Sequence, residues 1–396
     1  MGPEPAIRPR TMIRLRLLTP AIVLLGACSS TPQPALMPVY NDIRILESAP
    51  HLSANAEIAD FDGDGHNDIV LAIGRHWPGQ NLILFGDGAG GFTRTDTLST
   101  PGDRSYSMSA ADMDADGDLD LVVSNDRPDI NYVLLNDGTG QFPVRVDFGE
   151  AEWPTRNSTV ADLNRDGLPD VVVANRSGDP RTPGQELDAW SGGANFICLN
   201  RSDETFALAC EPLPSGSATT INTGDLNGDG HVDLIVPFRD GGQSHVFPGD
   251  GSGQFHGAVP FGPADANYRS AMALDANGDD RMDLVAMDDT DRSTTLFLQT
   301  GDFLFDEGTR LDNGVMIPYA LDLADLDMDG RTDVLVGYRG APSRLFFNRD
   351  GAWDQTVIGD SLGAAYGFGT GDLNGDGRTD IALARSDASD ILFLAR

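Results

Sequence analysis

The sequence contains no lysine, so all 27 of its basic residues are arginines. Against them stand 61 acidic residues, which give the 396-residue chain a formal net charge of −34 at pH 7. A negative field of this size repels phosphate backbones and anionic lipid surfaces. The composition therefore argues against nucleic acid or an anionic membrane surface as a partner.

The sequence also lacks the short motifs of common catalytic sites. It has no Gly-x-Ser-x-Gly elbow, no His-Glu-x-x-His pair and no phosphate-binding loop. Its six histidines are scattered. His66 and His231 fall inside acidic turns that could bind a cation, where we expect the backbone carbonyl of the histidine, and not its ring, to be the ligand. An enzyme is therefore not the first expectation, and His51, His76 and His256 are the candidate bases if there is catalysis.

Cysteine is scarce, with three residues in the chain. Cys198 and Cys210 lie on the two sides of an expected hairpin. In an oxidising compartment such a pair is expected to form a disulfide. The alternative is two buried free thiols.

The longest apolar run near the N-terminus, Leu17 to Leu25, is too short to span a bilayer. It follows Arg14 and Arg16 and ends in Leu-Gly-Ala-Cys, with the cysteine at Cys28. This resembles a bacterial lipobox, in which the cysteine is lipidated and becomes the first mature residue. The resemblance implies a signal peptide at 1–27, a flexible tether at 28–38 and an outer-membrane lipid anchor in the cell envelope. A plain secretory signal is the alternative.

What the sequence has in abundance is one nine-residue pattern, Asp-x-Asp/Asn-x-Asp-Gly-x-x-Asp, which occurs seven times. Ca²⁺ binds six to eight oxygens, and a tight turn with oxygens at positions 1, 3, 5 and 9 can supply them with the carbonyl of position 7. Glycine at position 6 permits the sharp bend. The alternative is a solvated acidic turn. We predict up to seven Ca²⁺ sites, with these ligands: Asp60, Asp62, Asp64, His66, Asp68; Asp112, Asp114, Asp116, Asp118, Asp120; Asp162, Asn164, Asp166, Leu168, Asp170; Asp225, Asn227, Asp229, His231, Asp233; Asp275, Asn277, Asp279, Arg281, Asp283; Asp325, Asp327, Asp329, Arg331, Asp333; Asp372, Asn374, Asp376, Arg378 and Asp380. The copy that starts at Asp275 departs most from the pattern, because Asp280 replaces its glycine.

Short runs of valine, isoleucine and leucine follow each acidic loop, which predicts buried strands. The loops recur about every 50 residues, with about four predicted strands per repeat, which is typical of a β-propeller. We therefore predict an all-β, seven-bladed β-propeller of four-stranded antiparallel blades over residues 39–396, with one insertion at 178–193. The last blade lacks its fourth strand, and we expect residues 39–46 to complete it and close the ring.

The acidic loops and the Gly-x-Gly-x-Phe turns at 88–92, 138–142 and 251–255 resemble those of FG-GAP/VCBS repeat proteins. The fold of that family is the propeller of the integrin α-subunit head. The resemblance implies this fold and bound calcium. It does not imply one activity, because the family includes adhesion modules, lectin-like modules and propellers attached to enzymes.

Arginines and aromatic residues gather in the connections expected on the face opposite the acidic loops. Both residue types suit carboxylates and sugar rings, through forked hydrogen bonds and stacking. Five of them, Tyr106, Arg156, Arg269, Tyr319 and Tyr366, stand six residues before a loop aspartate, at the expected mouth of the central channel. The alternative is that the arginines pair with neighbouring aspartates and the tyrosines plug the channel. The full candidate ligand face is Trp77, Tyr106, Arg127, Trp153, Arg156, Trp190, Arg239, Tyr268, Arg269, Arg292, Tyr319, Arg339, Tyr366 and Arg385.

These observations lead to three functional hypotheses. The first is a calcium-binding, lipid-anchored module that binds a glycan or a protein ligand. The second is a polysaccharide lyase or hydrolase with its site at the channel, and the third is a structural scaffold. A pocket that joins a histidine with tyrosine and two arginines would favour the enzyme, whereas a flat face would favour binding.

Overall fold

The computed structural model describes residues 37–47, 49–98, 102–176, 194–201, 206–213, 215–240, 242–312 and 314–396. They belong to a single compact unit, Leu36–Arg396. The expected signal peptide, Cys28, the tether up to residue 36, and the insertion with Trp190 lie outside the described residues. Over the described ranges, no helix is long and apolar enough to cross a membrane.

The strands pair into seven antiparallel groups of four, which we call blades 1 to 7. Blade 1 is β2 (His51–Ala59), β3 (Asp68–Ile73), β4 (Asn81–Gly86) and β5 (Phe92–Leu98); blade 2 is β6 (Ser105–Ala111), β7 (Asp120–Asn125), β8 (Asn131–Leu135) and β9 (Val144–Phe148); blade 3 is β10 (Thr155–Ala161), β11 (Asp170–Asn175), β12 (Asn195–Asn200) and β13 (Leu208–Leu213); blade 4 is β14 (Asn222–Gly224), β15 (Asp233–Val236), β16 (Ser244–Phe247) and β17 (Val259–Phe261). Blade 5 is β18 (Tyr268–Leu274), β19 (Asp283–Asp288), β20 (Ser293–Phe297) and β23 (Thr309–Arg310); blade 6 is β24 (Ile317–Ala324), β25 (Asp333–Arg339), β26 (Ser343–Arg349) and β27 (Ala352–Ile358); blade 7 is β28 (Ala364–Gly371), β29 (Asp380–Ala388), β30 (Ile391–Leu394) and β1 (Asp42–Ile45).

Blade 7 joins the two ends of the described chain. Strand β1 pairs antiparallel with β30, with Ile43 opposite Phe393 and Ile45 opposite Ile391. Because this fourth strand comes from the start of the propeller, blades 7 and 1 cannot separate without breaking a β-ladder. The prediction that residues 39–46 close the ring is confirmed, with the strand itself limited to Asp42–Ile45.

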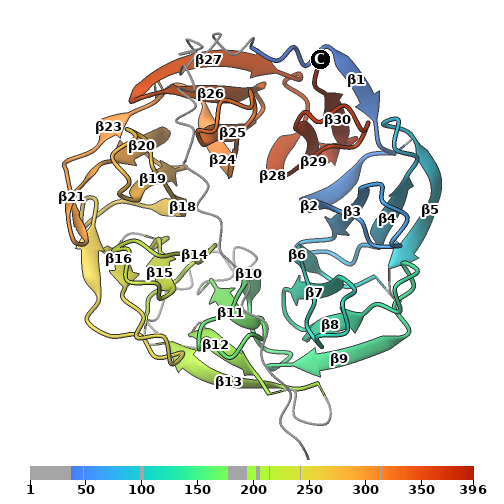
Figure 1. The fold of residues 1–396 in the computed structure, drawn as a ribbon, viewed down its shortest axis with the longest axis horizontal. Helices are drawn as coiled ribbons and strands as arrows, with labels where there is room; N and C mark the ends of the chain where they lie inside the picture. Colours follow the sequence, from blue (N-terminus) through green and yellow to red (C-terminus); the bar gives the residue numbers. More distant parts are fainter. Residues whose placement is uncertain are drawn as a thin grey trace, which may run out of the picture. The chain divides into compact units, whose positions relative to one another are not determined.

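The blades follow one another around a central opening, with the first strand of each repeat innermost (Figure 1). Seven separate hydrophobic clusters lie between neighbouring blades. Strand β3 shows why the strand after each acidic loop is apolar throughout. Because successive side chains point to opposite faces, its Val70 joins the cluster shared with blade 2, whereas Ile69 and Leu71 join the one shared with blade 7.

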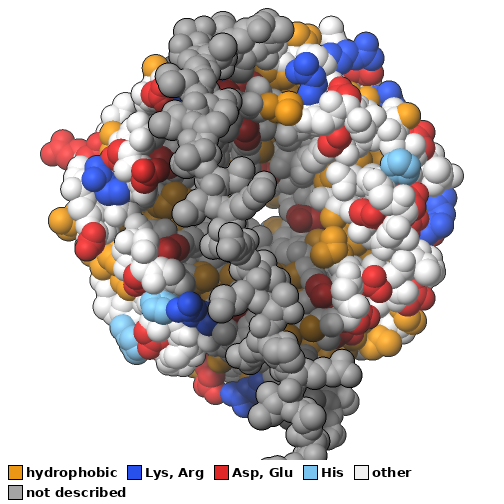
Figure 2. Space-filling view, in the orientation of Figure 1, with side chains coloured by type: hydrophobic (Ala, Val, Ile, Leu, Met, Phe, Trp, Pro, Cys, Tyr) orange, Lys and Arg blue, Asp and Glu red, His pale blue; other side chains and the backbone are white. Residues whose placement is uncertain are grey.

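The second residue of each acidic loop closes one of these clusters. Phe61 lies between blades 1 and 2, and Leu373 lies between blades 7 and 1, both at 1% exposure. An apolar residue is therefore needed between the first two polar positions of the loop, and it anchors the loop in the core. On the part of the face in Figure 2 that the described residues form, acidic side chains are spread around the circumference, in keeping with the net charge of −34.

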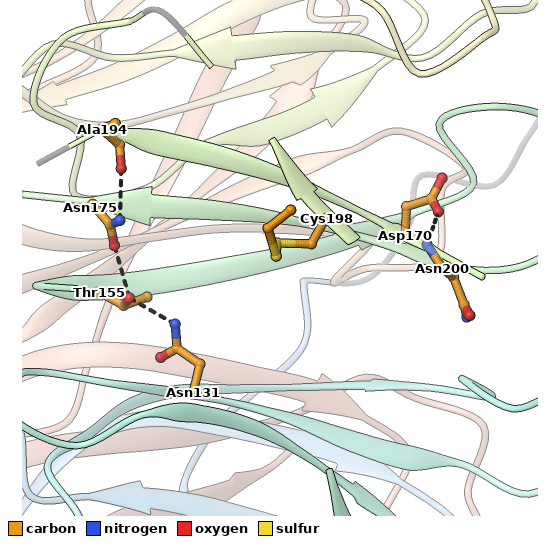
Figure 3. The surroundings of a disulfide bond; sticks show 8 residues. Asn131, Thr155, Asp170, Asn175, Ala194, Cys198 and Asn200 are labelled. Carbon is orange, nitrogen blue, oxygen red and sulfur yellow. Dashed lines mark hydrogen bonds between the residues drawn. A yellow bond between two sulfur atoms is a disulfide. The ribbon is translucent and has the colours of Figure 1, made fainter. Parts of the chain in front are cut away.

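Asparagine at the start of a third strand joins one blade to the next. The amide nitrogen of Asn131 donates to the hydroxyl of Thr155 at 2.9 Å, and that hydroxyl donates to Asn175 Oδ1 at 2.8 Å (Figure 3). Asn81 donates in the same way to Ser105, at 2.9 Å. These buried hydrogen bonds fix the register between adjacent blades at the end opposite the acidic loops.

Blade 3 carries a disulfide between Cys198 on β12 and Cys210 on β13, which face each other across the two strands (Figure 3). This agrees with the predicted pair, and the alternative of two free thiols is excluded. In blade 5, the degenerate turn after β20 forms a small hairpin of its own, β21 (Gln299–Gly301) with β22 (Leu304–Phe305).

Candidate metal loops and channel cavity

The first aspartate of each acidic loop organises the turn by accepting backbone hydrogen bonds. Asp60 accepts from the N–H of Gly63 at 2.8 Å and from that of Gly65 at 2.9 Å. Gly65 has φ +87°, a conformation that favours glycine. In the fifth copy, Asp280 takes φ +64° and its N–H donates to Asp275 at 3.0 Å. The replacement of glycine therefore preserves the loop conformation.

The last aspartate of each loop is buried and connects the loop to the third strand. Asp170 accepts from the N–H of Leu163 at 2.9 Å and from that of Asn200 at 2.7 Å (Figure 3). The same pair of bonds is made by Asp68, Asp120, Asp233, Asp283, Asp333 and Asp380. Burial raises the pKa of Asp170 to about 6, against the lowering effect of the two N–H donors. This residue thus has a structural role whether or not it also binds a cation.

Three loops bring carboxylate oxygens from positions 1, 3 and 9 within 4.8 Å of one another. In the same three loops, a buried oxygen of the position-3 aspartate has no hydrogen-bond partner in the described part of the chain: Asp62, Asp114 and Asp327. An unsatisfied buried carboxylate oxygen is costly, and a divalent cation would satisfy it. These residues fit a metal ion. The three groups are Asp60, Asp62 and Asp68; Asp112, Asp114 and Asp120; and Asp325, Asp327 and Asp333.

The other four loops carry asparagine at position 3, which offers one neutral oxygen. In two of them the amide turns toward the position-5 carboxylate, and Asn227 Nδ2 donates to Asp229 at 2.8 Å. Asn164 donates in the same way to Asp166 at 2.9 Å. The structure therefore separates the seven predicted sites into three with converging carboxylates and four with a less acidic set of ligands.

The innermost strands enclose a cavity of about 370 Å³. All five residues that stand six positions before a loop aspartate line it: Tyr106, Arg156, Arg269, Tyr319 and Tyr366. They come from five different blades, because the repeat places the same strand position at the same height around the channel. The spacing in the sequence thus identified residues that line the cavity at one level of the channel.

At this level of the channel, arginine and tyrosine side chains stack on one another. The guanidinium of Arg269 lies 3.9 Å from the ring centre of Tyr319, and its Nε donates to the Tyr319 carbonyl at 2.8 Å. Tyr319 and Tyr366 meet edge to face at 4.9 Å. Arg75 lies 4.1 Å over the Tyr366 ring. The result is a continuous stack in which two tyrosines in contact are flanked by two guanidiniums.

Ion pairs tie several arginines of this face to a neighbouring strand or blade. Arg156 pairs with Asp126, Arg176 with Asp240 and Arg385 with Asp360, each at 2.7 Å, and Arg239 pairs with Asp289. The alternative interpretation, that these arginines pair with aspartates, is therefore correct for these residues. Arg269 differs, because its nearest carboxylate is Asp289 at 4.0 Å, which Arg239 already holds. Two guanidiniums share one carboxylate, and the local charge is positive.

The pKa values of nearby groups reflect this excess of positive charge. Burial lowers the pKa of Arg239 to about 10, and Arg269 and Arg176 add to the shift. Burial alone would raise the pKa of Tyr319, but Arg269, a hydrogen bond with Tyr366 and Arg239 together lower it to about 8.

His76 belongs to a polar chain that ends at the cavity. Its Nδ1 lies 2.8 Å from Asp126 Oδ2, and its Nε2 lies 2.8 Å from the hydroxyl of Tyr106. Burial lowers the pKa of His76, against the hydrogen bond with Asp126, which raises it. A neutral ring would donate from Nδ1 to Asp126 and accept from Tyr106. This joins one histidine to a tyrosine and, through Asp126, to Arg156, which is part of the combination that would favour an enzyme.

Other members of the candidate ligand face lie elsewhere. Trp153 is 7% exposed and stacks on Phe196 in the core, with ring centres 3.9 Å apart. Tyr268 is also a core residue, stacked on Phe261. These two are corrections to the sequence analysis, because their rings fill space between blades. Trp77, Arg292 and Arg339 are exposed, and Arg127 is half-buried.

Two carboxylates of the cavity were missed by the sequence analysis. Glu57 on β2 and Asp322 on β24 each stand three residues before a loop aspartate, and both line the cavity. Residues three apart on a regular strand point to opposite faces, so the spacing alone did not indicate these carboxylates. A register shift at position −6, between Pro318 and Ala320 in β24 and between Ser53 and Asn55 in β2, brings positions −6 and −3 to the same cavity.

Comparison with known proteins identifies both the fold and the repeat. Many solved structures share the fold, and two of them serve as examples. BBS1N in complex with ARL6DN is 14% identical, with a TM-score of 0.59 over 91% of this chain and 97% of that one. An Agrocybe aegerita lectin that recognises non-reducing terminal N-acetylglucosamine is 17% identical, with a TM-score of 0.53 over 86% of this chain and 87% of that one. A comparison with curated proteins finds no match. The model of the FG-GAP-like repeat matches residues 60–123, 112–173, 225–286, 275–336 and 325–383. The chain therefore belongs to the family of FG-GAP-like repeat proteins.

Proposed function

We propose that the protein is a calcium-stabilised binding module whose ligand carries a carboxylate and enters the channel cavity. The observation that carries the proposal is the sharing of Asp289 by Arg239 and Arg269. It leaves a positive charge beside stacked tyrosines in a protein that is otherwise strongly acidic. Guanidinium and aromatic groups together bind carboxylates and sugar rings, so the ligand is an acidic glycan or a carboxylate group of a protein.

The acidic loops hold the Ca²⁺ ions in this proposal, beginning with the three that have converging carboxylates. Ca²⁺ prefers several oxygen ligands, and these loops offer carboxylate and backbone carbonyl oxygens. The ions stabilise the turns between the first two strands of a blade. They leave the channel to the ligand, because the acidic loops end the innermost strands opposite the arginines and tyrosines.

The lectin with the same fold supports a sugar ligand, since this architecture can present a saccharide site. The lipobox-like segment at Cys28 supports an anchor in the cell envelope. Together these give a tethered module that captures an acidic glycan or protein near a membrane, with the lipid as its sole contact with the bilayer.

The test is calorimetric titration of residues 37–396 in calcium with oligogalacturonate, and with a neutral oligosaccharide of equal length. Replacing Arg269 with Gln removes the least compensated charge. It should weaken oligogalacturonate binding about tenfold or more, because hydrogen bonds to charged groups contribute about 1.5–3 kcal/mol. Arg292→Gln, on an exposed residue of the same face, is the matched control. Equal affinity for the acidic and neutral sugars would refute the proposal.

The second candidate, a polysaccharide lyase, is favoured by the chain from Asp126 through His76 to Tyr106. Such a chain can move a proton at the Tyr106 hydroxyl, beside arginines that would hold a uronate. The same titration mixtures should then accumulate unsaturated sugar. Tyr106→Phe should abolish the product while binding persists, and no product from the wild-type protein excludes this candidate for the tested sugar.

A further inference from the structure

We propose that the channel cavity is a site for a zwitterion, with the ligand carboxylate at Arg269 and a ligand ammonium group at Glu57 and Asp322. This deepens the proposed function, on which it rests. It adds that the ligand must also carry a positive charge, at a fixed distance from the carboxylate. A short peptide and an amino-sugar uronate share this chemistry.

The two carboxylates come from blades that are not neighbours. Blade 7 lies between them, and its innermost strand β28 is rich in glycine. A Cβ at Gly367 would lie 2.9 Å from the Ala54 carbonyl oxygen of β2, and one at Gly371 would lie 2.7 Å from the Ile58 side chain. The glycines let β28 pack close to β2. Glu57 and Asp322 therefore approach closely enough for the negative charge of Asp322 to act on Glu57.

Neither carboxylate has a cationic partner among the described residues. The described residues offer Glu57 no hydrogen bond and no ion pair, and Asp322 accepts one bond, from the N–H of Leu323 at 2.8 Å. Both groups line the cavity. By contrast, the aspartates at the opposite end of the channel are paired to arginines. Both side chains are half-buried. A half-buried carboxylate without a partner loses part of its hydration, and a ligand cation would offset that loss.

The electrostatics of the channel support the same assignment. Burial raises the pKa of Glu57 to about 8, with Asp322 adding to the shift, and burial raises the pKa of Asp322 to about 7. At the other end, nearby guanidiniums lower the pKa of Tyr319. The cavity therefore has guanidiniums at one end and, at the other, two acidic groups whose ionised form a bound cation would stabilise.

The separation of the two ends sets the size of the ligand. The guanidinium of Arg269 lies over the ring of Tyr319. Tyr319 and Asp322 are three residues apart on β24, which is about 10 Å along a strand. An extended tripeptide has its terminal charges at about that distance. A cavity of about 370 Å³ lies at the small end of the range for ligand pockets, about 300–1,000 Å³.

Charge mismatch at either end gives selectivity. A ligand with two negative charges meets the carboxylates of Glu57 and Asp322, and a ligand with two positive charges meets Arg269. A purely anionic sugar binds in this scheme through its carboxylate alone, without the second contact. The zwitterion should therefore bind more tightly than any analogue that carries one charge.

The experiment is calorimetric titration of residues 37–396 in calcium with triglycine, N-acetyl-triglycine and triglycine amide. A second series uses a disaccharide of glucuronate and glucosamine, with and without N-acetylation. Each free zwitterion should bind about tenfold or more tightly than its acetylated form. The stronger series identifies the source of the ligand.

Glu57→Gln should remove most of the preference for the free amine over the acetylated form. Asp322→Asn should act in the same direction, and Glu150→Gln, on an exposed glutamate, should have no effect. Thermal melts confirm that each variant is folded. Equal affinity of free and acetylated ligands overturns the inference but leaves carboxylate binding in place. If neither form binds and acidic oligosaccharides also fail, both the inference and the proposed function fall.

Discussion

The guanidinium of Arg349 reaches into the acidic loop that begins at Asp325 and lies 2.7 Å from the carboxylate of Asp327. It also lies 3.0 Å from Asp329. Asp327 is the position-3 residue of a loop that could hold a metal ion. The protein thus places its own cation against carboxylates that would bind Ca²⁺, whereas Asp114, the equivalent residue of the second loop, has no ion pair among the described residues.

Replacing Arg349 with Gln should therefore strengthen Ca²⁺ binding in this loop. The side-chain amide keeps most of the volume but removes the competing charge. We expect a larger calcium-dependent rise in melting temperature than in the wild-type protein, measured by calorimetry across a calcium titration. Arg344→Gln on the same strand, an arginine that hydrogen-bonds Gln355, is the control. A smaller or unchanged response would show that the guanidinium does not compete with the ion.

Removing calcium should markedly lower the melting temperature. A site filled at 100 times its dissociation constant contributes about 2.7 kcal/mol, and several loops act together. Asp114→Asn should remove most of one such contribution, and Asp229→Ala should remove one site and leave the others. The measurement is thermal denaturation in calcium and in excess EDTA. Identical melts in the two conditions would contradict metal binding at most of the loops.

Asp170→Ala should destabilise the protein even in EDTA. It removes the acceptor of two buried N–H groups, those of Leu163 and Asn200. Each unsatisfied group costs about 1–3 kcal/mol, so the loss in the free energy of unfolding should be about 2–6 kcal/mol. Asp166→Ala, on an exposed residue of the same loop, should cost far less in EDTA. Urea denaturation of both variants without metal separates the structural role from the metal role.

Opening the Cys198–Cys210 disulfide should also destabilise the fold. The bond closes a loop of 12 residues in sequence, and a loop of this size contributes about 3 kcal/mol in the chain-entropy model. The double substitution of both cysteines by serine should show this loss in urea denaturation. A reducing agent should produce a similar loss in the wild-type protein and none in the double variant. No loss in either case would indicate that blade 3 is held by packing alone.

Glu57 and Asp322 should make stability depend on pH near neutrality. Burial raises the pKa of Glu57 from 4.5 to about 8 and that of Asp322 from 3.8 to about 7. Both values are raised in the folded state, so the stability linked to these groups is fully present below about pH 4. It is lost as the pH rises through 7 to 8.

Glu57→Gln should therefore resemble the wild-type protein at about pH 4 and be more stable than it at about pH 9, in melts recorded without ligand. Glu150→Gln should follow the wild-type curve throughout. A Glu57→Gln variant that is less stable at high pH would show that the ionised carboxylate is stabilised by a partner.

The periodic features of the molecule were readable from the sequence. The acidic loops, the apolar strand after each and the start of the third strand, as at Asn131, recur every 50 residues or so. Each follows from local chemistry: aspartate with glycine makes the turn, and a strand buried on both faces must be apolar. Because each pattern is repeated, these weak local signals together predicted the fold, the strand that closes the ring and the five residues that lie at one height in the channel.

The partners of individual side chains required the tertiary structure. The sequence alone could not show that Trp153 packs on Phe196 while Tyr319 lines the channel, because both rings occupy similar connections. Nor could it show that Arg349 faces Asp327, or that Asp289 is shared by two arginines from different blades. Sequence spacing determined which residues lie at the same level of the ring, because every blade repeats one strand pattern. Which charges meet across the blades was decided by side-chain packing between segments far apart in the chain, which no local pattern encodes.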